Sequence, residues 1–166
     1  MLFKKFFILV FLVLFSFSAT ANTPRSTGKY KNWESFTVQT DKGKICFAQT
    51  IPTKRAPASI KREKSKLFVT FRPSENIKDE VSMTSGHDYK SSTVTASSGK
   101  KRYSFFSQKN FAWLLDDQEE RGFIKTMKKA TNVIVKARTT KGAETTDHYS
   151  MMGFTKAYNT AKKSCS

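Results

Sequence analysis

Two histidine and aspartate pairs are the side chains in this sequence best suited to acid–base chemistry. His87 is followed by Asp88, and Asp147 is followed by His148. An imidazole beside a carboxylate can act as a general base toward a hydroxyl group, and three serines lie near these pairs: Ser82, Ser85 and Ser150. None of them lies in a strained nucleophile turn such as Gly-x-Ser-x-Gly. A hydrolase remains one hypothesis, and a metal site would need both segments to meet in space.

Neighbouring carboxylates offer a second kind of chemistry. They occur as Asp79-Glu80, Asp116-Asp117 and Glu119-Glu120. Glycoside hydrolysis needs two carboxyl groups on opposed walls of a cleft, whereas the members of each pair are neighbours in the chain. A loop, a helix cap and a first helical turn account for them. Because the sequence also has no glycine-rich phosphate loop, we predict no catalytic residues, no cofactor and no metal.

Period-two hydrophobic alternation begins at Trp33 and predicts the elements that would position these groups. A turn at 41–44 separates two alternating segments and indicates a hairpin. Further strands are predicted at 67–71, 81–84, 93–96, 103–106, 111–115, 133–137 and 145–151. The segment 51–59 contains two prolines and is predicted as a loop or a sheet edge. Short strands at this spacing favour an antiparallel sandwich or barrel.

Two short helices are predicted to interrupt the strands. Asp116 or Asp117 can cap the first, which has acidic residues in its first turn and Lys128 and Lys129 in its last. The second covers about 155–163 and would deliver Cys165 to its partner. The polar segment 22–32 is predicted to be flexible, and 33–166 to form a single domain.

The first 21 residues have the three parts of a secretory signal peptide: two lysines, an apolar run and a small-residue cleavage site. We predict cleavage between Ala21 and Asn22. A membrane anchor would need about 20 apolar residues, and this run is shorter. No further transmembrane candidate follows, so the mature chain is expected in the periplasm, on the outer membrane or outside the cell.

The chain has two cysteines, Cys46 and Cys165. In an oxidising compartment an even pair favours one disulfide. The alternative is two buried free thiols.

The net charge of +17 comes from basic residues scattered along the sequence. They indicate either a solvated surface or attraction to an anionic envelope polymer, a lipid headgroup or a surface protein. Nucleic acid is excluded as a partner, because the chain has neither an RNP-type motif nor zinc-ligand spacing and is exported. Trp33, Trp113 and the phenylalanines are predicted to be core residues, with an exposed patch for a glycan or a protein as the alternative.

Several segments, taken in order, are similar to a known family: residues 43–48, 71–82, 112–113, 127–129, 133–136, Gly142 and 145–154. Together they resemble the invasion-associated locus B family of exported alphaproteobacterial proteins. The resemblance implies an immunoglobulin-like β-sandwich, an address in the periplasm or beyond, and no established enzymatic activity. It also leaves Cys46 as the partner of Cys165, because 36–39 lacks the second early cysteine of some members.

The resemblance places Thr146, Asp147, His148 and Tyr149 on one strand, which we treat as a possible functional segment. The main hypothesis is a non-enzymatic, exported envelope protein that binds an acidic envelope or cell-surface partner. The alternative is a periplasmic hydrolase that uses His87, Asp88, Asp147 and His148.

Overall fold

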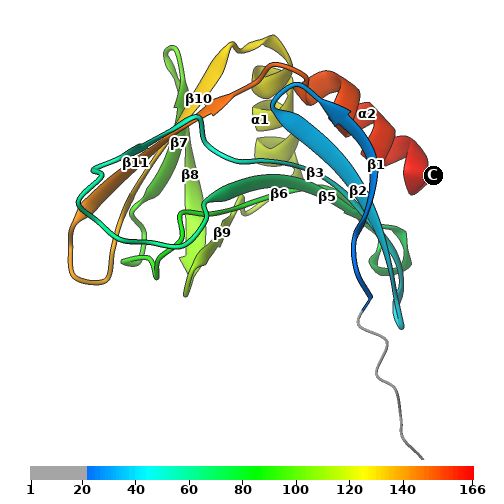
Figure 1. Ribbon diagram of the computed structural model, residues 1–166, viewed down its shortest axis with the longest axis horizontal. Helices are drawn as coiled ribbons and strands as arrows, with labels where there is room; N and C mark the ends of the chain where they lie inside the picture. The colour runs from blue at the N-terminus through cyan, green and yellow to red at the C-terminus, as the bar shows by residue number, and fades with distance from the viewer. Residues whose placement is uncertain (1–21) are drawn as a thin grey trace, which may run out of the picture.

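The alternating sequence folds into antiparallel strands, which the computed structural model describes for residues 22–166 (Figure 1). The predicted signal peptide, including Ala21, lies outside these residues. The strands are β1 (Arg25–Tyr30), β2 (Trp33–Thr40), β3 (Gly43–Thr50), β4 (Lys54–Ala56), β5 (Lys66–Arg72), β6 (Ile77–Thr84), β7 (Val94–Ser98), β8 (Lys101–Gln108), β9 (Phe111–Trp113), β10 (Asn132–Arg138) and β11 (Glu144–Ser150). The helices are α1 (Asp117–Lys129), α2 (Phe154–Ser164) and a short 3-10 turn, η1 (Pro73–Glu75).

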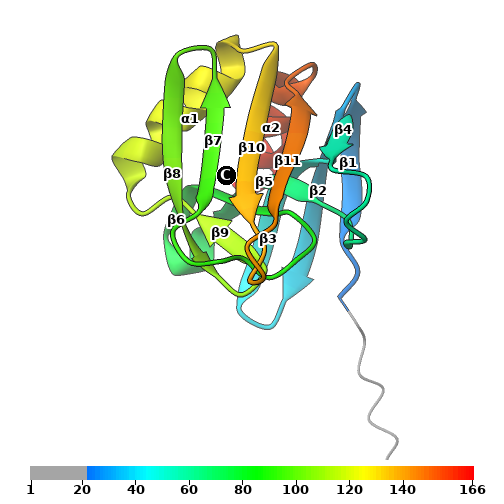
Figure 2. The same cartoon turned by 90° about the vertical axis from the view of Figure 1, so that its left-hand side faces the viewer.

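The strands are hydrogen-bonded in the single order β1-β2-β3-β5-β6-β9-β8-β7-β10-β11-β4. The predicted all-β fold with two short helices is confirmed. An immunoglobulin-like sandwich has two separate sheets. Here β8 belongs to both halves of the strand order and joins them. Its residues 101–105 pair with β7 and its residues 106–108 pair with β9. A strand that changes partners in this way makes a corner between sheets. Figure 2 faces β7, β8, β10 and β11 toward the viewer.

Both helices pack on the same side of the strands from β1 to β6 (Figure 1). The face of β5 that carries Leu67, Val69 and Phe71 is buried beneath them. Phe71 contacts Tyr158 of α2, with ring centroids 5.6 Å apart. The predicted cap of α1 is confirmed, because Asp116 Oδ1 accepts a hydrogen bond from the Glu119 N–H at 2.8 Å.

The amino-terminal segment 22–32, for which flexibility was expected from its polar sequence, contains the strand β1. Its backbone pairs with β2 from Arg25 opposite Thr37 to Tyr30 opposite Trp33. The Tyr30 hydroxyl also lies 2.9 Å from Thr160 Oγ1 of α2. Backbone hydrogen bonds need no apolar side chains, so a polar segment can complete a sheet without a hydrophobic signature.

The predicted disulfide between Cys46 and Cys165 is present, and neither thiol is free. It joins β3 to the end of α2 across a sequence separation of 119 residues. Chain-entropy arguments give such a loop a stabilisation of at most about 4–5 kcal/mol. The 51–59 prediction is also confirmed, because β4 pairs only with β11, at the sheet edge.

Candidate functional site

Asp147, the central carboxylate of the hydrolase hypothesis, lies in a buried ion pair. The Arg62 guanidinium donates to both of its oxygens, Nη2 to Oδ1 at 2.6 Å and Nη1 to Oδ2 at 2.8 Å. The two side chains are 2% and 1% exposed. Arg62 also donates to the Ser85 carbonyl at 2.8 Å. The carboxylate therefore anchors the 51–65 segment to β11 and is engaged by a cation rather than by an imidazole.

The two histidines are found at different faces of β11: His87 packs against one face from a loop, and His148 projects from the other. His87 Nε2 lies 2.9 Å from Thr145 Oγ1, on the buried face that Thr145 shares with Asp147. His148 belongs to the opposite, partly exposed face, because successive residues of a strand alternate. The structure therefore brings His87 near Asp147 but leaves His148 on the other side. Within residues 22–166, no group of three acidic, histidine or cysteine side chains is arranged to hold a metal.

The candidate serines have structural partners. Ser85 Oγ accepts a hydrogen bond from the Tyr89 hydroxyl at 3.0 Å, and burial raises the pKa of Tyr89 to about 12. Ser150 Oγ accepts from the Met152 N–H at 3.3 Å. Ser82 lies on β6, opposite Trp113 of β9, and faces away from the buried side that carries Val81 and Met83. None of these contacts pairs a serine hydroxyl with a histidine.

The possible functional segment 146–149 is an inner stretch of β11, paired on both sides. The backbone of Thr146, Asp147 and His148 pairs with β4 on one side, and the whole segment pairs with β10 on the other. Tyr149 is buried, and the loss of hydration raises its pKa well above the ordinary value. The segment positions neighbouring strands, and only Thr146 and His148 are partly exposed.

Three lysines meet where α1 packs beside the start of β8. Lys125 and Lys129 project from successive turns of α1, and together with Lys101 they line a pocket of about 180 Å³. We call these three residues the basic cluster. The Tyr103 hydroxyl fixes the helix against the strand by donating to the Gly122 carbonyl at 3.1 Å, and it lies 2.7 Å from Thr126 Oγ1.

The lysines of the basic cluster take part in none of the ion pairs found within residues 22–166. Three of the basic residues that are scattered in sequence are therefore brought together here by the packing of α1 beside β8. Sequence spacing gives no signal for this, because β8 and α1 are separated by β9 and their packing depends on the fold.

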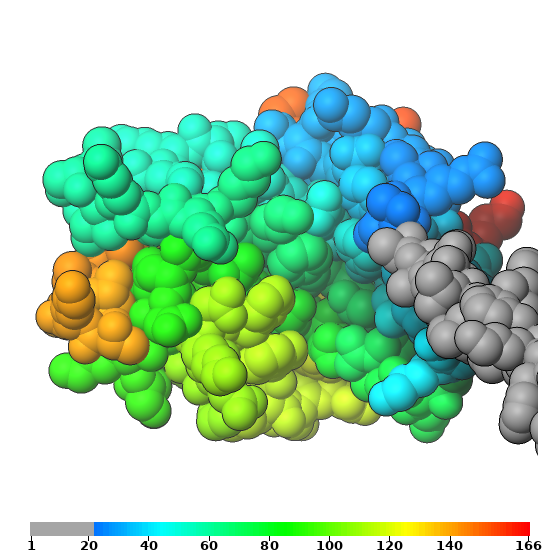
Figure 3. Space-filling view, turned by 60° about the horizontal axis from the view of Figure 1, so that its bottom comes forward, coloured from blue at the N-terminus to red at the C-terminus, as the bar shows by residue number. Residues whose placement is uncertain are grey.

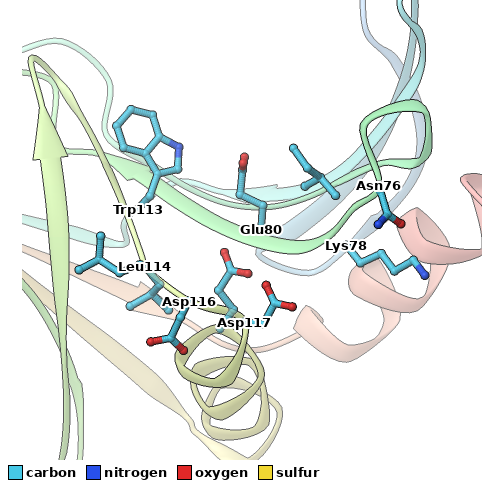
Figure 4. Close-up of a pocket in the computed structure, with 10 residues that line it drawn as sticks. Asn76, Lys78, Glu80, Trp113, Leu114, Asp116 and Asp117 are labelled. Atoms are coloured by element: carbon cyan, nitrogen blue, oxygen red, sulfur yellow. The ribbon is translucent and has the colours of Figure 1, made fainter.

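Four of the six paired carboxylates, Glu80, Asp116, Asp117 and Glu120, line a cleft of about 490 Å³ between β6 and the start of α1. Figure 4 shows Lys78 and Glu80 on β6 and Asp116 and Asp117 at the start of α1, with the Glu80 and Trp113 side chains pointing away from these two aspartates. We call this the acidic cleft. The cap predicted from the sequence is present at Asp116. The sequence did not predict that β6 and α1 bring Glu80, Asp116, Asp117 and Glu120 to the same cleft.

Comparison with protein-family models, curated proteins and solved structures finds no match to this chain. No helix within residues 22–166 has the length and apolar character needed to cross a membrane.

Proposed function

We propose that this chain is an exported, non-enzymatic envelope protein of the invasion-associated locus B type, which binds an anionic partner through the basic cluster. The observation that carries the proposal is that Lys101, Lys125 and Lys129 line one pocket and that none of the ion pairs among the described residues involves them. Holding like charges together is unfavourable for the isolated protein. An anionic ligand relieves that repulsion, so such a cluster attracts phosphate or carboxylate groups.

The export assignment is supported by the amino-terminal sequence and by the disulfide. Lys4 and Lys5, the apolar run and Ala21 have the order of a secretory signal peptide. The Cys46 to Cys165 disulfide is typical of proteins in oxidising compartments outside the cytoplasm. The family resemblance adds the same address, the periplasm or the cell surface. An anionic partner there would be a lipid headgroup or an acidic polymer, and both present the same chemistry to the lysines.

The test is retention of oxidised protein on two probes across a salt series: phosphatidylglycerol vesicles and polygalacturonate. The variant carries Lys101→Glu, Lys125→Glu and Lys129→Glu. The control carries Lys42→Glu, Lys54→Glu and Lys141→Glu, three exposed lysines elsewhere, so both proteins have the same net charge.

We expect the wild type and the control to bind at low salt, and binding to fade as salt screens the charges. A lysine near an anionic surface contributes about 1 kcal/mol, so the cluster variant should bind roughly a hundredfold more weakly. Binding to vesicles alone identifies headgroups as the partner, and binding to polygalacturonate alone identifies a polymer. No binding of the wild type to either probe at low salt, or equal loss in variant and control, would contradict the proposal.

A further inference from the structure

A row of aromatic rings crosses the sheet face that the helices do not cover. It consists of Phe36 on β2, Phe47 on β3, Phe68 on β5, and Phe111 and Trp113 on β9. Successive ring centroids are 5.2, 6.2, 6.4 and 5.8 Å apart. We call these five residues the aromatic row. All five side chains are partly exposed rather than buried.

The row is a second apolar face on strands whose other face already forms the core. Phe68 alternates with Leu67 and Val69, which are fully buried on the helix side. In an antiparallel sheet with one buried face, the opposite face is ordinarily polar. Here four of the five rings, all except Phe36, line an open groove of about 430 Å³ instead. Figure 3 turns this side toward the viewer: green to yellow-green atoms of the middle of the chain lie in its lower half, blue and cyan-green atoms of the first strands and the 51–65 segment lie above them, and α2 appears only at the margin.

The groove continues into the acidic cleft, because Trp113 and Glu80 line both. Glu80 is held in place by Arg72, which donates to its two oxygens at 3.1 and 2.7 Å. Planar charged pairs of this kind present fixed donors and acceptors, and β6, which carries Glu80, lies between the strands of Phe68 and Trp113. Aromatic surface and oriented polar groups therefore follow one another along a single path.

Glu120 adds a carboxyl oxygen at the cleft. Its side chain is only 8% exposed, and its Oε1 accepts a hydrogen bond from the Val81 N–H at 3.0 Å. The buried polar side-chain atoms that lack a partner among the described residues do not include its other oxygen, and Glu120 lines the cleft. A carboxyl oxygen that reaches the cleft can accept a hydrogen bond from a ligand hydroxyl or amine.

We propose that the aromatic row and the acidic cleft together bind a non-acidic polysaccharide chain. The C–H faces of pyranose rings stack on aromatic rings, and their hydroxyl groups bind carboxylate and amide side chains such as those of Glu80 and Asn76. A linear series of rings fits a chain of sugars better than a single sugar. The carboxylates repel an acidic polymer and admit neutral or amine-bearing sugars. This inference does not depend on the basic cluster.

The test measures binding of three probes by calorimetry: cellohexaose, a chitosan hexamer and a galacturonate hexamer. Phe68→Leu removes one ring but keeps apolar bulk, and Trp113→Ala removes the ring shared by the groove and the cleft. Met152→Ala is the control, since Met152 is an apolar side chain, 49% exposed, outside the row. Thermal unfolding and vesicle binding of each variant show whether its fold and basic cluster remain intact.

We expect the wild type and Met152→Ala to bind cellohexaose or the chitosan hexamer, and the galacturonate hexamer to bind at least about tenfold more weakly. Each ring variant should lose about tenfold in affinity, as expected for one stacking contact. Absence of binding to both non-acidic probes, equal or tighter binding of the galacturonate hexamer, or wild-type affinity in both folded ring variants would overturn the proposal. Loss of vesicle binding alone would leave it intact and would count only against the basic cluster.

Discussion

At the scale of single residues, the pair formed by Asp147 and Arg62 joins β11 to the 51–65 segment from within the core. Asp147→Asn would leave the Arg62 guanidinium buried without its counter-charge. Breaking one side of a buried ion pair costs about 3–5 kcal/mol, and we expect a loss of that size in the free energy of unfolding measured by urea titration.

The neighbouring His148→Ala variant is the matched control for Asp147→Asn. His148 is partly exposed, and its contacts with Thr53 use the backbone carbonyl. Its removal should change the free energy of unfolding by no more than about 0.5 kcal/mol. An Asp147→Asn protein as stable as the wild type, or a large loss in the histidine variant, would show that the anchor has been assigned to the wrong residue.

Glu120 makes stability depend on pH. Burial raises its pKa to about 7, the Val81 N–H opposes that shift, and the charges of Glu80, Asp117 and Asp79 add to it. Between the ordinary value of 4.5 and about 7 the folded state retains a proton that the unfolded state releases. Raising the pH through this window therefore lowers the free energy of unfolding.

Glu120→Gln should remove that pH dependence, because glutamine does not titrate and can still accept from the Val81 N–H. The measurement is the urea midpoint of wild type and variant from about pH 4 to about pH 8. The variant should gain stability relative to the wild type as the pH rises. Glu119→Gln, one residue earlier, is the control, and its urea midpoint should change with pH in the same way as that of the wild type. A constant difference between wild type and Glu120→Gln would contradict the assignment.

At the scale of elements, strands with alternating apolar residues were predictable, and strands without them were not. The pattern around Leu67, Val69 and Phe71 predicts β5 because one face must be buried. The β1 strand has no such pattern, and backbone pairing with β2 defines it. The order of the strands, including the shared strand β8, depends on contacts distant in sequence that local alternation does not encode.

The candidate sites were less predictable than the strands, for the same reason. Trp33 is fully buried, as predicted for a core aromatic residue, whereas Trp113 is partly exposed in the aromatic row. Composition cannot distinguish these two tryptophans. Strand register does so, because it places Trp113 opposite Ser82 and Phe106 on the face without helices. The acidic cleft likewise requires β6 and α1 to meet, although three strands separate them in the chain.

At the scale of the whole molecule, the two proposed surfaces belong to different sides of the fold. The basic cluster lies on α1 and the start of β8, and the aromatic row lies on the sheet face that the helices leave uncovered. They share no residue, and the acidic cleft shares Glu80 and Trp113 with the groove of the aromatic row. Separate sites of opposite preference on one rigid domain allow both partners to bind at once.

We therefore expect a single molecule to attach a non-acidic saccharide to an anionic membrane. Fluorescent cellohexaose should sediment with phosphatidylglycerol vesicles only when the protein is present. The triple lysine variant should fail because it stays off the vesicles, and Phe68→Leu should reach the vesicles while carrying less saccharide. A mixture of these two variants should not restore co-sedimentation to the wild-type level, because each surface must be intact in the same molecule. Full restoration by the mixture, or release of vesicles on addition of the saccharide, would show that the two surfaces do not act together.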